Sequence, residues 1–131
     1  MSRLCLCTSK RPFDQCCEPY LTGKKLPETP EKLMRSRFSA YSLAKAEYLI
    51  RTTAEKERAE LDRDELYAYC KTVKCISLKI VSTEAGGPED QEGIVLFHAS
   101  LQIDGKRMLH REKSRFTREE GRWVYVDGET N

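Results

Sequence analysis

The sequence lacks any long apolar run: no stretch approaches the roughly 20 consecutive apolar residues that a transmembrane helix needs. The first five residues, Met1-Ser2-Arg3-Leu4-Cys5, also lack the apolar core of a secretory signal peptide. There is no glycine-rich phosphate loop, no Gly-x-Ser-x-Gly or Ser-x-x-Lys motif, and no His-Glu-x-x-His motif. These absences predict a cytoplasmic protein without a membrane segment, and they leave no enzyme class to assign.

Charge of one sign is also scarce, since 23 basic residues face 21 acidic ones and the net charge is only +2. A charge this small gives no strong global field for nucleic acid, so DNA is not an expected partner. The charge is uneven, however. Residues 1–53 carry 10 basic and 5 acidic side chains, whereas residues 54–92 carry 6 and 10. The basic front is either an ordinary solvated surface or a face for an acidic partner.

Cysteine is present in quantity, and four of the six cysteines lie within 13 residues: Cys5, Cys7, Cys16 and Cys17. A reducing compartment would not preserve disulfides, and the adjacent pair Cys16-Cys17 is poorly placed to form one. Zinc accepts four thiolates in a tetrahedron, and such a closed site is structural. The spacing predicts a Zn²⁺ site in a short segment that gains its order from the ion. The alternative is four unligated thiols in a frayed tail.

The same stretch carries a resemblance. Cys5-Leu6-Cys7-Thr8-Ser9-Lys10-Arg11-Pro12-Phe13-Asp14-Gln15-Cys16-Cys17 resembles the SEC-C motif, a zinc knuckle also found in the SecA translocation ATPase. Residues 26–41, together with Tyr48-Leu49-Ile50-Arg51-Thr52, Glu112-Lys113-Ser114-Arg115-Phe116 and the stretch 121–128, resemble the YchJ-like family of uncharacterised bacterial proteins. These matches run from one end of the chain to the other, so the resemblance covers the whole sequence.

The resemblance implies an α+β fold similar to the nuclear transport factor 2 and ketosteroid isomerase superfamily. N-terminal helices would pack on a curved antiparallel sheet and leave a cone-shaped cavity. It divides the chain into a knuckle at residues 1–25 and a cone domain at residues 26–131. It supplies no reaction. Because the SecA knuckle recruits protein partners, the resemblance implies a non-catalytic adaptor role with contacts to another protein through the knuckle. RNA is the other partner considered, because the basic N-terminal segment has Phe13 and Tyr20 among its lysines and arginines, a composition typical of a zinc knuckle that stacks bases.

The knuckle departs from the family pattern in its loop. The family has glycine after the second cysteine and again two residues later, where this sequence has Thr8 and Lys10, and Glu18 replaces the glycine after Cys17. Glycine in such a loop usually supplies a positive φ, which a β-branched threonine resists. All four candidate ligands remain, but the altered loop predicts that zinc affinity is either weakened or lost.

The remaining residues predict helices first and strands afterwards. Thr29-Pro30 is a typical helix start, and an apolar stripe continues the helical pattern to about Thr53. Nothing in the sequence forces a break near Ala44, although the resemblance implies two helices. A further helix follows Asp62, with Leu66, Tyr67 and Cys70 on its inner side, and Cys75 is expected to be buried. Residues 54–65 are charged, which is typical of a loop or an exposed helix.

From Val73 the period changes to two, which predicts strands near residues 73–81, 94–103, 106–118 and 122–126. Asp104-Gly105 is a type I′ hairpin signal, and Glu120-Gly121 marks a second short turn. Turns this short predict an antiparallel meander.

The expected cavity gives the alternative function: a small ligand or substrate held in the cone. On the third strand, His110 and Glu112 would share a face and form an acid–base pair if both were desolvated. The pocket candidates are Arg37, Tyr41, Tyr48, His98, His110, Glu112, Ser114 and Trp123, with Tyr125 beside them. Each has a structural alternative: Trp123 as core, and Arg37 with Glu112 as an ion pair tying helix to sheet.

Overall fold

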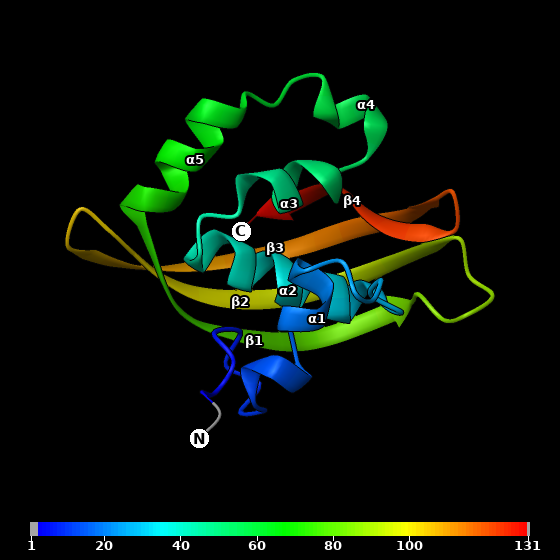
Figure 1. The fold of residues 1–131 in the computed structure, drawn as a ribbon, viewed down its shortest axis with the longest axis horizontal. Coiled ribbons are helices and arrows are strands. Elements are labelled where there is room, and N and C mark those ends of the chain that lie inside the picture. Colours follow the sequence, from blue (N-terminus) through cyan, green and yellow to red (C-terminus); the bar gives the residue numbers. More distant parts are fainter. Residues whose placement is uncertain (1–2, 131) are drawn as a thin grey trace.

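In the computed structural model, which describes residues 3–130, helices cover one face of a four-stranded sheet (Figure 1). The helices are the 3-10 turn η1 (Phe13–Gln15), α1 (Glu18–Leu21), α2 (Pro30–Ser42), α3 (Ala46–Arg51), α4 (Glu55–Arg58) and α5 (Arg63–Thr72). The strands are β1 (Val73–Ala85), β2 (Glu92–Ile103), β3 (Lys106–Glu119) and β4 (Arg122–Thr130). They pair antiparallel in sequence order, so the predicted α+β meander is confirmed.

The two long helices begin where the sequence indicates. The Thr29 hydroxyl accepts a hydrogen bond from the Lys32 amide at the start of α2, and Pro30 occupies the first helical position. Asp62 caps α5 in the same way through the Glu65 amide. Each cap satisfies one of the amides that a helix N-terminus leaves without a partner.

The helical pattern from residue 30 to 53 divides into α2 and α3, as the resemblance implied. The break is a Schellman motif, in which the Lys45 amide bonds to the Ala40 carbonyl and the Ala44 amide bonds to the Tyr41 carbonyl. Ala44 takes the left-handed position with a φ of 56°. Because this position usually belongs to glycine, an alanine here hides the break from the sequence.

Both predicted turns of the meander have the left-handed backbone that a type I′ turn requires. Asp104 and Gly105 have φ values of 54° and 79°, and Glu120 and Gly121 have values of 53° and 81°. In α5, Cys70 is buried, but Tyr67 is exposed, so placing Tyr67 on the inner side of this helix was wrong. No helix within residues 3–130 is both long enough and apolar enough to span a bilayer.

The main core lies between α2 and the inner face of the sheet. It contains Leu33, Met34, Phe38, Leu78, Val95, Phe97, Phe116 and Trp123. The same cluster includes Phe13 and the four N-terminal cysteines, so the N-terminal segment of residues 3–17, which begins with a small hairpin, packs directly on the cone. Figure 1 shows this hairpin beside β1. The domain boundary between residues 25 and 26 stays a prediction.

Candidate metal centre and cone cavity

The four N-terminal cysteines meet at one point. Residues 3–13 form a small hairpin, with hydrogen bonds from the Cys5 amide to the Arg11 carbonyl and from the Phe13 amide to the Arg3 carbonyl. This hairpin carries Cys5 and Cys7. The turn η1 then brings Cys16 and Cys17 back toward them, and all four side chains are buried.

The sulfur geometry fits a four-coordinate metal. The four Sγ atoms lie within 4.8 Å of one another, and those of Cys7 and Cys16 are 3.6 Å apart. A tetrahedral zinc–thiolate site with bonds of ~2.3 Å has sulfur–sulfur edges of about 3.8 Å. The thiols are free, and the Cys7–Cys16 separation is far longer than a disulfide of ~2.0 Å. The cluster can therefore hold a metal ion, and four sulfur ligands would leave no open coordination position.

The pKa values of the clustered thiols are shifted in opposite directions. Hydrogen bonds from the Cys17 and Cys5 thiols lower the pKa of Cys7. Burial raises the pKa of Cys16 to about 11, and the hydrogen bonds to Cys5 and Cys7 raise the pKa of Cys17. One thiolate is therefore stabilised by its neighbours, and a cation must displace the remaining protons to bind all four sulfurs.

Three polar contacts attach the cysteine hairpin to the cone. The Thr8 hydroxyl accepts a hydrogen bond from the Leu78 amide of β1 at 3.0 Å and lies 3.0 Å from the Leu78 carbonyl. The Cys5 sulfur is 3.6 Å from the Ser39 hydroxyl of α2. Arg35 of α2 donates to the Cys7 carbonyl at 3.4 Å and lies 3.9 Å from the Cys7 sulfur.

Thr8 and Lys10 stand where the family pattern has glycine, and both adopt the positive φ that glycine would supply. Thr8 and Lys10 have φ values of 60° and 72°. A non-glycine residue in this region carries strain of order 1–3 kcal/mol. The hydrogen bonds between Thr8 and Leu78 offset part of this cost, so the replacement by threonine adds a contact that glycine could not make.

A cavity of about 270 Å³ lies between α2, α5 and the sheet. Its wall is mostly aromatic and aliphatic, with few polar groups. The lining residues are Met34, Arg37, Phe38, Tyr41, Tyr69, Val73, Cys75, Phe97, Ala99, Leu101, His110, Glu112 and Tyr125. The sequence did not predict the apolar lining residues, because each has the pattern of an ordinary core residue. The space between them arises only from the curvature of the sheet.

Glu112 is the centre of the polar groups in this cavity. Its Oε1 accepts a hydrogen bond from His110 Nε2 at 2.8 Å. Its Oε2 accepts from the Tyr125 hydroxyl at 2.9 Å and, through a short hydrogen bond, from the Ser114 hydroxyl. Burial and the Glu112 charge raise the pKa of Tyr125, so its hydroxyl keeps the proton that it donates.

The structure separates the sequence-predicted pocket residues into two groups. Arg37, Tyr41, His110 and Glu112 line the cavity. Ser114 is fully buried behind Glu112, whereas Tyr48 bonds to the Ser36 hydroxyl at 2.6 Å and Trp123 donates to the Glu28 carbonyl at 3.2 Å. These three residues belong to the packed interior and do not line the cavity.

His98 does not belong to the cavity either, and its prediction was wrong. The buried residues of β2 are Gly93, Val95, Phe97 and Ala99, so His98 points to the opposite face of the sheet, where it pairs with Arg111 of β3. Both faces of β2 carry apolar side chains. The alternation of side chains along the strand therefore could not show which face packs toward the helices.

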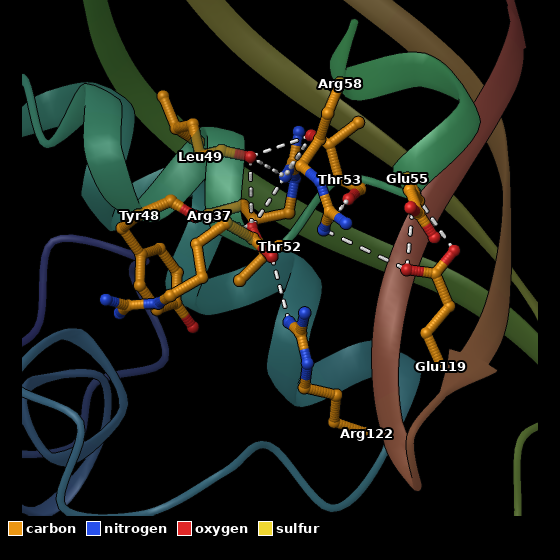
Figure 2. Close-up of polar contacts among 10 residues, drawn as sticks. Arg37, Tyr48, Leu49, Thr52, Thr53, Glu55, Arg58, Glu119 and Arg122 are labelled. Carbon is orange, nitrogen blue, oxygen red and sulfur yellow. Dashed lines mark hydrogen bonds and ion pairs between the residues drawn. The ribbon is translucent and has the colours of Figure 1, made fainter.

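Arg37 is buried, with 5% of its surface exposed, and makes no ion pair with Glu112 or with any other carboxylate among residues 3–130. Its Nη1 donates instead to the Leu49 carbonyl, the Thr52 hydroxyl and the Thr53 hydroxyl (Figure 2). Its guanidinium group lies 4.6 Å from the ring centre of Tyr125. The predicted ion pair is therefore replaced by contacts to the C-terminus of α3, where the helix dipole favours a cation.

The segment after α3 positions Tyr125. The Ala54 amide donates to the Tyr125 carbonyl and the Tyr125 amide donates to the Thr52 carbonyl, both at 2.8 Å. Figure 2 shows the polar contacts that hold this segment, including those from Arg58 and Glu119. Backbone pairing, the Arg37 contact and the Glu112 hydrogen bond together fix the tyrosine at the cavity wall.

Gly128 leaves the space that the Glu112 carboxylate occupies, because a Cβ atom at residue 128 would overlap that carboxylate. We expect Gly128→Ala to lower the free energy of unfolding by ~1–3 kcal/mol and to displace Glu112 from His110. Urea denaturation and the ¹⁵N shifts of the imidazole measure the two effects. Gly87→Ala is the control, since its Cβ would meet only the Asp90 side chain at 3.4 Å. Unchanged imidazole shifts in Gly128→Ala would contradict the assignment.

Comparisons with known proteins agree with this architecture. The family model described as "YchJ, middle NTF2-like domain" matches residues 29–128. A UPF0225 protein of Geobacter sulfurreducens is 37% identical over 128 residues, covering 98% of this chain and 80% of the relative. A UPF0225 protein of Vibrio parahaemolyticus is 38% identical, covering 98% and 75%.

Two solved structures share the fold. The solution structure of a SEC-C motif containing protein from Rhodopseudomonas palustris has a TM-score of 0.89 and 32% identity, covering 98% of this chain and 99% of that one. The crystal structure of a SEC-C motif containing protein from Psychrobacter arcticus has a TM-score of 0.83 at 24% identity, covering 98% and 83%. The chain therefore belongs to the YchJ-like family of SEC-C motif proteins.

Proposed function

We propose that this protein binds a small, largely apolar molecule in the cone cavity, and that Zn²⁺ on the four cysteines holds the N-terminal hairpin against the sheet. The observation that supports the first part is the convergence of Arg37, His110, Glu112 and Tyr125 on one apolar cavity of about 270 Å³. Apolar cavities with a few convergent polar groups are typical ligand sites.

The donor chemistry supports zinc as the ion. Four buried sulfur ligands without an oxygen or nitrogen ligand favour zinc or an iron–sulfur centre over magnesium or calcium. The sulfur atoms are spaced for one ion rather than a cluster of ions, and a closed four-sulfur site is structural. The metal would therefore act on folding, by fixing the hairpin that Thr8 and Cys5 attach to β1 and α2.

The size of the cavity limits the ligand. Binding pockets for small molecules commonly measure ~300–1,000 Å³, and an apolar cavity of ~150 Å³ accommodates benzene. At about 270 Å³ this cavity suits a molecule of one or two rings. The aromatic walls formed by Phe38, Phe97 and the T-shaped pair Tyr41–Tyr69 favour a flat apolar body.

Naphthalene is a suitable fluorescent probe of this proposal. We expect wild-type protein to bind it, and Leu101→Trp, which fills the cavity wall, to bind it at least ~10-fold more weakly. Gln102→Trp, one residue further along the same strand and outside the lining, is the matched control with wild-type affinity. Fluorescence titration measures both, and equal affinity in the two variants would count against the cavity.

An adaptor role through the knuckle is the second candidate. The hairpin exposes Arg3, Leu4, Lys10 and Arg11, which are three basic side chains and one apolar side chain. Such a surface suits an acidic protein or single-stranded RNA. Fluorescence anisotropy with a single-stranded RNA should show binding that weakens with salt and with Lys10→Glu plus Arg11→Glu. No binding at low salt would exclude the RNA partner.

A further inference from the structure

The polar groups of the cavity are unequally available to a ligand. Glu112 already accepts three hydrogen bonds, from His110, Ser114 and Tyr125, and its side chain is only 13% exposed. A carboxylate offers about four acceptor positions, so little of its capacity remains. These donors fix the position of the carboxylate, and Oε1, with one hydrogen bond against two at Oε2, keeps the larger share of the remaining acceptor capacity.

His110, in contrast to Glu112, keeps one ring nitrogen free to accept a hydrogen bond from a ligand. Its Nε2 is bonded to Glu112, but Nδ1 has no hydrogen-bond partner among residues 3–130, and 36% of its side chain is exposed. When a carboxylate accepts the Nε2 proton of a neutral imidazole, Nδ1 is left as the acceptor. The ring lies beside Phe97, with the ring centres 5.9 Å apart, and both residues line the cavity.

The charges at the cavity favour a neutral ligand. Arg37 directs Nη1 to three neutral acceptors at the end of α3 and lies against the ring of Tyr125. Its positive charge and the negative charge of Glu112 both belong to the cavity lining, so the two formal charges cancel over the site as a whole. Glu112 would repel an anion that approached His110. The remaining polar lining residues, Tyr41 and Tyr69, carry neutral hydroxyl groups.

We propose that the ligand is a neutral hydroxyl compound of one or two rings, whose O–H donates a hydrogen bond to His110 Nδ1. This inference rests on the proposed function of the cavity. His110 contacts the ligand, and Glu112 is a positioning residue that holds the imidazole in the Nε2–H tautomer. In this arrangement the imidazole of His110, and not the carboxylate of Glu112, forms the hydrogen bond to the ligand.

Comparison of 2-naphthol with naphthalene tests the inference, because the two probes differ by one hydroxyl group. Wild-type protein is expected to bind 2-naphthol about 10-fold more tightly, as one buried hydrogen bond predicts. His110→Phe keeps the ring volume and naphthalene binding but loses this preference. Glu112→Gln weakens the preference for 2-naphthol, because the imidazole of His110 is then no longer held in the Nε2–H tautomer.

Imidazole ¹⁵N spectra give a readout that a purely structural role would not change. The chain has two histidines, so His98 on the opposite face of the sheet is an internal control. We expect 2-naphthol to shift Nδ1 of His110 alone, and Glu112→Gln to alter the tautomer signature before ligand is added. Binding of naphthalene without a preference for 2-naphthol overturns this inference but leaves the proposed function intact. Failure of both probes to bind overturns both.

Discussion

Replacing Cys16 and Cys17 by serine is expected to remove the bound metal and to lower the free energy of unfolding by at least ~4 kcal/mol. This is the stabilisation that a ligand supplies at about 1,000 times its dissociation constant. The two residues provide half of the sulfur cluster, and the hairpin has few other internal contacts. The cone, with its own core between α2 and the sheet, should stay folded.

Elemental analysis by mass spectrometry and urea denaturation measure this result. We expect about one zinc per wild-type chain, as one tetrahedral sulfur site predicts, and none in the double variant. Cys75→Ser is the matched control, because Cys75 lies outside the cluster and is only half-buried. Wild-type protein without metal, or a double variant of unchanged stability, would show that the cluster is not a structural centre.

Arg37→Met is expected to be the most destabilising single substitution in the cone, with a loss of ~3–5 kcal/mol. The buried guanidinium satisfies the Leu49 carbonyl and two threonine hydroxyls at 2.7–3.3 Å. Methionine is similar in length but donates nothing, so the buried acceptors lose a partner and the end of α3 loses its cation. Displacement of Tyr125 should follow, because its ring packs on the same side chain.

Arg63→Met provides the comparison. Arg63 pairs with Glu47 at 2.6 Å, but the two side chains are 67% and 65% exposed. Exposed ion pairs contribute ~0–1 kcal/mol, so this variant should unfold almost as wild type does. Equal effects of the two substitutions in urea denaturation would mean that the network around α3 is not a stabilising element.

The sequence predicts the parts of this fold that depend on local chemistry. Helix α2 begins at Thr29-Pro30 and α5 at Asp62, because a side-chain oxygen caps the first amides. The turn at Asp104-Gly105 follows from two residues that tolerate positive φ. The four cysteines were found by spacing alone, since few other residues can supply a closed sulfur site.

The sequence does not predict features decided by packing at a distance. Ala44 has the positive φ that ends α2, a position where glycine is usual. Because alanine stands there, the residue pattern alone did not indicate the break between α2 and α3. His98 was assigned to the wrong face because Ile94 and Leu96 are as apolar as Val95 and Phe97. The place of Tyr125 beside the cavity was predicted from its position on the last strand, but the pairing of residues 52–54 with β4 that fixes it there is a contact that no local pattern indicates.

Thr8 has a further consequence for the outer edge of the sheet. β1 is an edge strand, and an edge strand presents free amides and carbonyls that can recruit a strand from another molecule. Thr8 occupies the amide and carbonyl of Leu78 near the middle of β1, while residues 52–54 cover part of β4 at the opposite edge. The cysteine hairpin thereby covers part of the β1 edge that could otherwise pair with a strand of another molecule. Oxidation of the cysteines, or chelation of the proposed metal, is expected to release the hairpin from β1 and expose this strand edge. Such protein should self-associate while its cone is still folded.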